Sequence, residues 1–216
     1  MPSRPRPLPL RSWPETAAPP DTGISAPGTS SDKAPGRAAA LITAIVVWAA
    51  AAERIGALTL HRLAARPAVV WPLLAVSWLG DGKLWYAVLL ALPFLDGWRG
   101  VRWGLVAVAV GGVNLALCCA MKHRTARLRP FRSCPGIRAC GPTLDEFSFP
   151  SGHTMHAVAF GMLLSHPYPA AAPWLLGFGV LVALSRVVLG LHYPSDVAAG
   201  AVIGWASAIA ALLIAV

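Results

Sequence analysis

Residues 148–156 of this chain read Ser-Phe-Pro-Ser-Gly-His-Thr-Met-His, a polar start to an otherwise apolar segment. Pro150 favours an extended residue before it and Ser151 is a good N-cap, so the stretch predicts a helix that begins near Ser151. A helix N-terminus attracts anions through its unpaired N–H groups, and Gly152 lets a phosphate approach the main chain closely. His153 would stand beside that anion. Taken alone, the stretch also fits a helix start whose histidine is only a hydrogen-bonded cap.

Two further blocks carry the polar groups that a phosphate site needs. Residues 122–130 read KHRTARLRP, in which Lys122 and Arg129 are seven residues apart and would share one face of a helix. Residues 185–196 read SRVVLGLHYPSD, which supplies Arg186, His192 and Asp196. Phosphoryl transfer requires cations around the phosphate oxygens, an in-line nucleophile and a proton for the leaving oxygen, and the three blocks hold a candidate for each.

The three blocks resemble the signature of the type 2 phosphatidic acid phosphatase (PAP2) superfamily, which includes soluble acid phosphatases, vanadium haloperoxidases and membrane lipid phosphatases. The pattern is Lys-x6-Arg-Pro, then Pro-Ser-Gly-His, then Ser-Arg-x5-His-x3-Asp, and every fixed position is present here in order. The resemblance implies that His192 is the nucleophile, that Asp196 orients it, and that His153 acts first as acid and then as base. The expected phosphate-binding residues are Lys122, Arg129, Ser151, Gly152 and Arg186.

The composition indicates a membrane protein. The 216 residues are 56% hydrophobic and only 12% charged, with a mean hydropathy of +0.60, which is too apolar for a soluble domain and long enough for several spans. The net charge of +9 does not indicate nucleic acid, because the cations lie at segment ends and in the central loop without an aromatic and basic platform. An anionic lipid phosphate in the bilayer is the expected partner.

The order of apolar segments predicts an all-α polytopic protein with about six transmembrane helices. Residues 1–37 are rich in proline and arginine and are predicted to be a disordered tail, which leaves residues 38–216 as the transmembrane domain. Residues 67–80 are apolar but short and contain Pro72, so they are expected to lie in the interface or re-enter. The expected spans are residues 38–60, 84–95, 101–121, 151–165, 174–189 and 195–216. The aromatic residues expected at the membrane interfaces are Trp71, Trp78, Trp85, Tyr86, Trp98 and Trp103.

The same order places the three blocks on one side of the membrane. A helix from Ser151 crosses and the helix that ends near Leu189 returns, so His153 and His192 emerge on the same face, and one loop joins Lys122 to Ser151. With a cytoplasmic N-terminus, six spans put this face outside. The expected location is a bacterial inner or plasma membrane with the active site facing outward.

Several minor features are interpreted in the same way. His156, one turn after His153, fits a structural hydrogen bond, and Cys118 and Cys119 fit packing. Cys134 and Cys140 either close a small disulfide or stay free thiols, and the sequence leaves both open. The other loop arginines are interpreted as a solvated face or a headgroup attractor, with Asp145 and Glu146 as partners; they are Arg124, Arg127, Arg132 and Arg138.

Three other functions compete with lipid phosphate hydrolysis. A zinc hydrolase would use His153, His156 and His192, but the neighbouring cations disfavour a bound metal ion, and no metal or cofactor is expected. A transferase would pass the phosphoryl group from the same intermediate to an alcohol. A non-catalytic transporter or lipid-binding protein would explain the apolar segments but would not require both histidines and Asp196. The substrate classes considered are isoprenyl diphosphate, phosphatidate and phosphatidylglycerol phosphate.

Overall fold

The computed structural model describes residues 37–143 and 145–215, and this part of the chain is helical. It holds no β-strand and only an isolated bridge between Leu128 and Phe147, so the predicted all-α class is confirmed. The chain divides into two units, residues 1–40 and 41–216, and the bundle belongs to the second. The predicted tail lies outside the described residues apart from Arg37, and it stays a prediction together with its boundary.

The helices follow the apolar segments of the sequence. Their bounds are α1 Arg37–His61, α2 Pro67–Trp78, α3 Leu84–Thr125, α4 Pro130–Ser133, α5 Gly152–Ser165, α6 Ala172–Val188 and α7 Pro194–Ala215. Helix α2 continues through Pro72. A proline inside such a helix is tolerated where neighbouring helices and local adjustments satisfy the freed main-chain groups.

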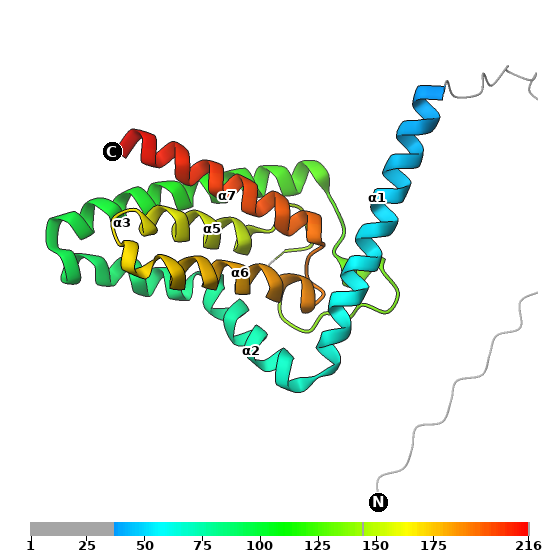
Figure 1. Ribbon diagram of the computed structural model, residues 1–216, viewed down its shortest axis with the longest axis horizontal. Helices are drawn as coiled ribbons and strands as arrows, with labels where there is room; N and C mark the ends of the chain where they lie inside the picture. The colour runs from blue at the N-terminus through cyan, green and yellow to red at the C-terminus, as the bar shows by residue number, and fades with distance from the viewer. Residues whose placement is uncertain (1–36, 144, 216) are drawn as a thin grey trace, which may run out of the picture. The chain divides into compact units, whose positions relative to one another are not determined.

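Two Asp-Gly pairs interrupt the long helical stretch instead. Between α2 and α3, Asp81 leaves helical geometry and Gly82 has a φ of 102°; within α3, Asp96 and Gly97 do the same, with a φ of 52° at Gly97. The second break folds α3 into a hairpin whose two halves run side by side (Figure 1). A Cβ atom on Gly100 would lie 2.0 Å from the carbonyl oxygen of Leu92, so only glycine permits this approach of the two halves.

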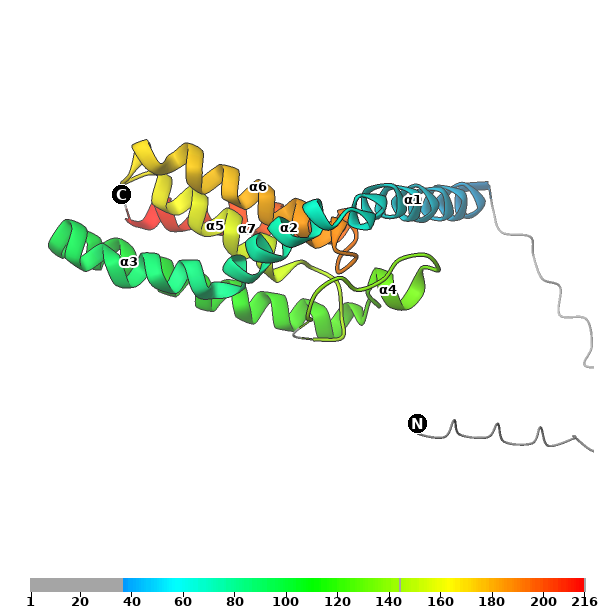
Figure 2. The ribbon, with the colours of Figure 1, turned by 90° about the horizontal axis from the view of Figure 1, so that it is seen from below.

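Helix α5 lies at the centre and packs against α3, α6 and α7. In Figure 2 it lies between α6 and α3. It meets α7 at two glycines: a Cβ on Gly200 would be 2.5 Å from the Ser151 carbonyl oxygen, and one on Gly204 would be 2.2 Å from that of Met155. Small residues four apart let two apolar helices touch through their main chains. This contact fixes the start of α5 against the start of α7.

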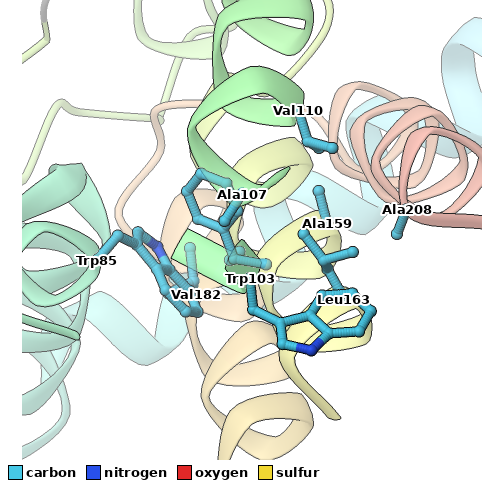
Figure 3. Close-up of a cluster of buried hydrophobic side chains, with 10 residues drawn as sticks. Trp85, Trp103, Ala107, Val110, Ala159, Leu163, Val182 and Ala208 are labelled. Carbon is cyan, nitrogen blue, oxygen red and sulfur yellow. The ribbon is translucent and has the colours of Figure 1, made fainter. Parts of the chain in front are cut away.

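The apolar core fills the space between these helices, and Figure 3 shows Trp85, Trp103, Leu163 and Val182 within it. Trp85 and Trp103 are buried, so their predicted position at the membrane interface is wrong. Both stand near the ends of apolar segments, which suggested an interface, but Trp85 packs against α5 and α6 and Trp103 packs against His166 at the end of α5. Trp71 and Trp98 are largely exposed.

Four helical stretches of the described chain are long and apolar enough to cross a membrane: Leu41–Ala65, Pro67–Thr125, Pro169–Val188 and Pro194–Ala215. The second of these contains both Asp-Gly breaks. Helix α5 has 14 residues, about 21 Å at 1.5 Å per residue, which is short for a span. The membrane class is confirmed, whereas the number of six spans is not.

Candidate active site

A cavity of about 530 Å³ opens between the two halves of α3, the break before α3 and the start of α5. Its apolar wall includes Trp85, Tyr86, Leu89, Val108, Leu115 and Phe160. Its polar end is lined by Asp81, Lys122, Arg129, Asp145, His153, Arg186 and His192. The structure therefore brings residues from all three sequence blocks around one cavity.

His192 reaches the cavity through a turn that follows α6. Gly190 has a φ of +74°, and a Cβ there would lie 2.5 Å from the Arg138 carbonyl oxygen, so the turn requires glycine. The N–H groups of Leu191 and His192 both donate to the carbonyl oxygen of Arg186 at 3.0 Å. These bonds turn the chain back and bury the His192 ring.

The two nitrogens of the His192 ring have different neighbours. Nε2 lies 3.2 Å from Nη1 of Arg129, and Nδ1 lies 3.6 Å from Oδ2 of Asp196, which is beyond hydrogen-bond distance but close for an electrostatic contact. Burial, together with the charges of Arg186, Arg129 and Lys122, holds the pKa of His192 well below its ordinary value of 6.5. The ring is therefore neutral, with the proton favoured on the Nδ1 side by Asp196 and a lone pair on Nε2.

Asp196 is held in place by two groups. The N–H of Tyr193 donates to Oδ2 at 2.8 Å, and Nη1 of Arg127 donates to Oδ1 at 2.7 Å. Arg127 also pairs with Glu53 and stacks over the ring of Tyr193. The interpretation of Arg127 as a solvated loop charge is thus wrong, because its half-buried guanidinium orients the buried carboxylate beside His192.

Lys122 and Arg129 share one carboxylate. Asp145 accepts from Lys122 Nζ at 2.5 Å and from Arg129 Nη2 at 2.8 Å. Burial raises the pKa of Asp145, but the hydrogen bonds and charges of Lys122 and Arg129 lower it further, so the net pKa is below its usual value. The predicted partners of Asp145 were other loop arginines; Glu146 does pair with one of them, Arg132. An anionic group already lies between the two cations, where a phosphate would be attracted.

Arg186 is a buried cation of a different kind. Its Nη1 donates to Ser77 Oγ at 2.6 Å, its Nε has no hydrogen-bond partner, and no carboxylate within the described residues lies at ion-pair distance from it. A buried guanidinium without a counter-ion is unfavourable unless an anion arrives. Arg186 therefore has donors available for an anion in the cavity.

The start of α5 has the predicted geometry but a different hydrogen-bond pattern. Ser151 is the N-cap residue, yet its N–H donates to the Asp196 carbonyl oxygen and its hydroxyl contacts Thr154. Ser151 is buried and is not among the residues that line the cavity. Gly152 does line it, and a Cβ there would be 3.1 Å from Cys118 Sγ.

His153 extends from the first turn of α5 into the cavity. Its Nε2 lies 3.1 Å from Oδ1 of Asp81, a contact that the sequence analysis did not predict. His156 contacts the carbonyl oxygens of Gly152 and Gly111 through its two nitrogens, in agreement with a structural role. In the part of the chain that the structure describes, no three His, Cys, Asp or Glu side chains are arranged to hold a metal ion.

The two cysteines of the polar loop are not joined by a disulfide in this structure. Cys134 and Cys140 are free thiols, and Cys134 Sγ lies 3.1 Å from the hydroxyl of Tyr193. Cys118 is buried in α3, in agreement with packing, whereas Cys119 is exposed and lines the cavity.

Sequence reasoning missed four residues that contact the site: Asp81, Asp145, Arg127 and Ser77. A signal was available for Asp81, because a carboxylate within an apolar stretch of a membrane protein marks a functional position by default. The other three lie outside the signature blocks or at its variable positions, and only the fold brings them to the site.

These features define a helical membrane protein with a cation-lined cavity at one end of its bundle. Residues 102–216, more than half of the chain, match the PAP2 superfamily. The chain belongs to this superfamily, and the resemblance inferred from the three blocks is confirmed.

Curated relatives agree with this assignment. The chain is 32% identical over 139 residues to a decaprenylphosphoryl-5-phosphoribose phosphatase of Mycobacterium tuberculosis, a match that covers 64% of this chain and 76% of the relative. It is 34% identical over 133 residues to an undecaprenyl-diphosphatase of Sulfolobus acidocaldarius, covering 59% of this chain and 62% of the relative.

Two solved structures share the fold. One is the transmembrane PAP2 type phosphatidylglycerolphosphate phosphatase from Bacillus subtilis, with a TM-score of 0.62 and 23% identity over 81% of this chain and 94% of that chain. The other is Aquifex aeolicus LpxE, with a TM-score of 0.63 and 24% identity over 74% of this chain and 94% of that chain.

Proposed function

We propose that this protein is an integral membrane phosphatase that hydrolyses a lipid phosphate or diphosphate through a phosphohistidine on His192. The observation that carries the proposal is the position of His192 Nε2, 3.2 Å from Arg129 Nη1 at the polar end of the cavity. The lowered pKa keeps the ring neutral, so Nε2 has a lone pair, which accepts a hydrogen bond from Arg129 until the substrate phosphate takes that donor. Relatives named as phosphatases of polyprenyl-linked phosphates support the same assignment.

In the proposed reaction the substrate phosphate lies among Lys122, Arg129 and Arg186 and displaces Asp145 from the first two. The Nε2 lone pair attacks phosphorus, an N–P bond forms, and the P–O bond to the leaving group breaks with its electron pair on oxygen. His153 gives its proton to that oxygen. In the second half a water oxygen attacks phosphorus, the N–P bond breaks, and His153 takes the proton of the water.

The three cations supply the charge that a metal ion would otherwise provide. At an effective dielectric of about 20, each pair of unit charges at 4 Å is worth roughly 4 kcal/mol before desolvation. Arg186 is the most important of the three here because it is buried and Asp81 and Asp145, among the described residues, act on it only from beyond ion-pair distance. We therefore include metal independence in the proposal.

The apolar wall is the proposed place of the lipid tail. It continues from the polar end along the α3 hairpin, and two of its residues, Tyr86 and Leu115, are largely exposed. In a membrane protein such exposed apolar side chains face lipid. A substrate can then keep its tail in the bilayer while its phosphate reaches His192.

The proposed location is a bacterial inner or plasma membrane with the polar end of the cavity outward, on the strength of the order of segments. An Ala139→Cys substitution in a Cys118→Ala, Cys119→Ala, Cys134→Ser, Cys140→Ser background tests this orientation. A membrane-impermeant thiol reagent is expected to label it in intact cells, and labelling only after permeabilisation would contradict the outward face.

Trapping the intermediate tests the mechanism. The purified full chain is mixed with a ³²P-labelled lipid phosphate in the presence of EDTA and quenched rapidly. The wild type and His166→Ala, a control at the far end of α5, are expected to form an acid-labile, base-stable label, whereas His192→Ala is expected to form none. A label on His192→Ala refutes the assigned nucleophile, and activity that EDTA abolishes and a divalent ion restores refutes metal independence.

A further inference from the structure

The break between α2 and α3 places a carboxylate in the cavity wall. Asp81 has a φ of −76° and a ψ of 25°, and Gly82 follows with a φ of 102°. A Cβ on Gly82 would lie 3.0 Å from the Tyr86 ring, so both conformation and space favour glycine there. This local geometry ends α2 and allows Asp81 to contact His153 at the start of α5.

The contacts of Asp81 define where its charge acts. Oδ1 lies 3.1 Å from His153 Nε2, and Oδ2 lies 3.6 Å from Nζ of Lys83. Lys83 is more exposed than Asp81, so solvent weakens the ion pair between them. The remaining negative charge acts inside the cavity, on the nitrogen of His153 and, at longer range, on Arg186.

Under the proposed function, the position of Asp81 beside His153 bears on the leaving group. His153 then protonates the leaving oxygen, so the leaving group must stand next to His153 Nε2 and therefore next to Asp81. We propose that Asp81 determines which leaving groups are accepted: it favours the neutral alcohol of a phosphate monoester and disfavours the anionic phosphate that leaves from a diphosphate. The inference rests on the proposed function and narrows its substrate to a lipid-linked phosphate monoester.

Two physical effects act in the same direction. A carboxylate repels a second anion across a few ångströms, and like charges at an interface select strongly against the wrong ligand. The same carboxylate accepts hydrogen bonds from hydroxyl groups that neighbour the ester oxygen, which a polyhydroxylated alcohol would supply. Asp81 lies outside residues 102–216, the part of the chain that matches the superfamily, so the superfamily match does not account for this residue.

The test compares two substrates with the same tail, farnesyl phosphate and farnesyl diphosphate, on the purified full chain. The measured quantity is the ratio of kcat/KM for the diphosphate to kcat/KM for the monophosphate, with release of inorganic phosphate as the signal. Asp81→Asn keeps the shape and removes the charge, so this ratio is expected to rise by about tenfold or more.

Two further variants control the result. Asp96→Asn makes the same change at the other Asp-Gly break, where Asp96 contacts Arg99 and Tyr168, and is expected to leave the ratio unchanged. Asp81→Glu retains the charge and is expected to keep the ratio near that of the wild type, even if both rates fall.

The outcomes distinguish the role of Asp81 from the proposed function. An unchanged ratio in Asp81→Asn, or an equal rise in Asp81→Glu, overturns the role of Asp81 while the phosphatase stands. Failure of the wild type to release phosphate from either compound, and from a longer polyprenyl phosphate, overturns the proposed function and this inference with it.

Discussion

The two ends of helix α5 have nearly the same kinds of residues and very different surroundings. At its start, His153 stands near an Asp-Gly break and two arginines, Arg129 and Arg186. At its end, His166 stands near a second Asp-Gly break and two other arginines. Those arginines are Arg99 and Arg102.

The difference between the ends is burial. Arg129 and Arg186 are 2% and 3% exposed, whereas the side chain of Arg99 is 60% exposed and pairs with Asp96 at 3.8 Å. Arg102 is exposed and donates to the carbonyl oxygen of Ala215. A charge in solvent is screened, while a buried charge interacts strongly with the next anion that enters.

The types of residue present at an end of α5 do not by themselves define the site. The same types of side chain serve as ordinary surface and helix-end groups at one end. At the other they surround a cavity in which Arg186 has an unpaired Nε and His192 an unpaired Nδ1. Variants at matched positions of the two ends test whether burial causes this difference.

The largest difference is expected between His153→Ala and His166→Ala. Loss of a general acid and base lowers turnover by about 10² to 10⁴, so phosphate release from a lipid phosphate should fall by this factor in His153→Ala and stay near wild type in His166→Ala. With p-nitrophenyl phosphate, whose leaving group needs little protonation, His153→Ala should still accumulate the phosphoenzyme. Equal activity of the two variants would remove the distinction between the ends.

A smaller difference is expected between Arg186→Ala and Arg99→Ala. Removing one preorganised donor from a charged transition state costs about a hundredfold in rate, and Arg186 is placed to be such a donor. Steady-state kinetics should show this loss in kcat/KM for Arg186→Ala and a change of less than about twofold for the exposed Arg99→Ala. Near-normal turnover of a folded Arg186→Ala protein would exclude Arg186 from the phosphate site.

The smallest effect is expected on the apolar wall of the cavity. Gly112 lines it, and a Cβ there would meet nothing within 4 Å. Gly112→Leu should occupy the space for the tail and lower kcat/KM for a decaprenyl phosphate about tenfold, the equivalent of roughly 1.4 kcal/mol of lost binding. Geranyl phosphate, with a short tail, should be affected less.

Gly177→Leu is the matched control for this change. A Cβ on Gly177 would also meet nothing within 4 Å, but this glycine does not line the cavity. Equal losses for both tails in Gly112→Leu, or the same loss in Gly177→Leu, would show that the wall does not hold the lipid.

The sequence was a good guide to the fold wherever a feature was local. Apolar runs predicted the helices, and Pro150 and Ser151 predicted the start of α5. The environment of Trp85 and Trp103 was predicted wrongly because burial depends on which helix packs against each face. The uninterrupted path of α2 through Pro72 likewise depends on the surrounding structure.

The residues of the candidate site were likewise predictable where they belong to the signature blocks and not where the fold brings them in. The signature blocks identified Lys122, Arg129, His153, Arg186 and His192, which all line one cavity. Asp81 and Asp145 could not be assigned, because they reach these residues through the break before α3 and through an irregular loop. Ser151 was predicted to hold phosphate, but its N–H donates to Asp196 instead. The spacing of residues in the sequence does not show which groups of neighbouring helices form hydrogen bonds with each other.

The contact of α5 with α7 through Gly200 and Gly204 has a consequence for how such a protein can diversify. It joins His153 and the segment from His192 to Asp196 into one rigid piece, since the Ser151 N–H also donates to the Asp196 carbonyl oxygen. Asp81 belongs to the break before α3, and the wall that includes Tyr86 and Gly112 belongs to α3 itself. Under the proposed mechanism, bond cleavage and substrate choice therefore lie in different parts of the fold, and mutation of Asp81 or of the apolar wall in α3 can retarget the enzyme while His153 and His192 stay intact.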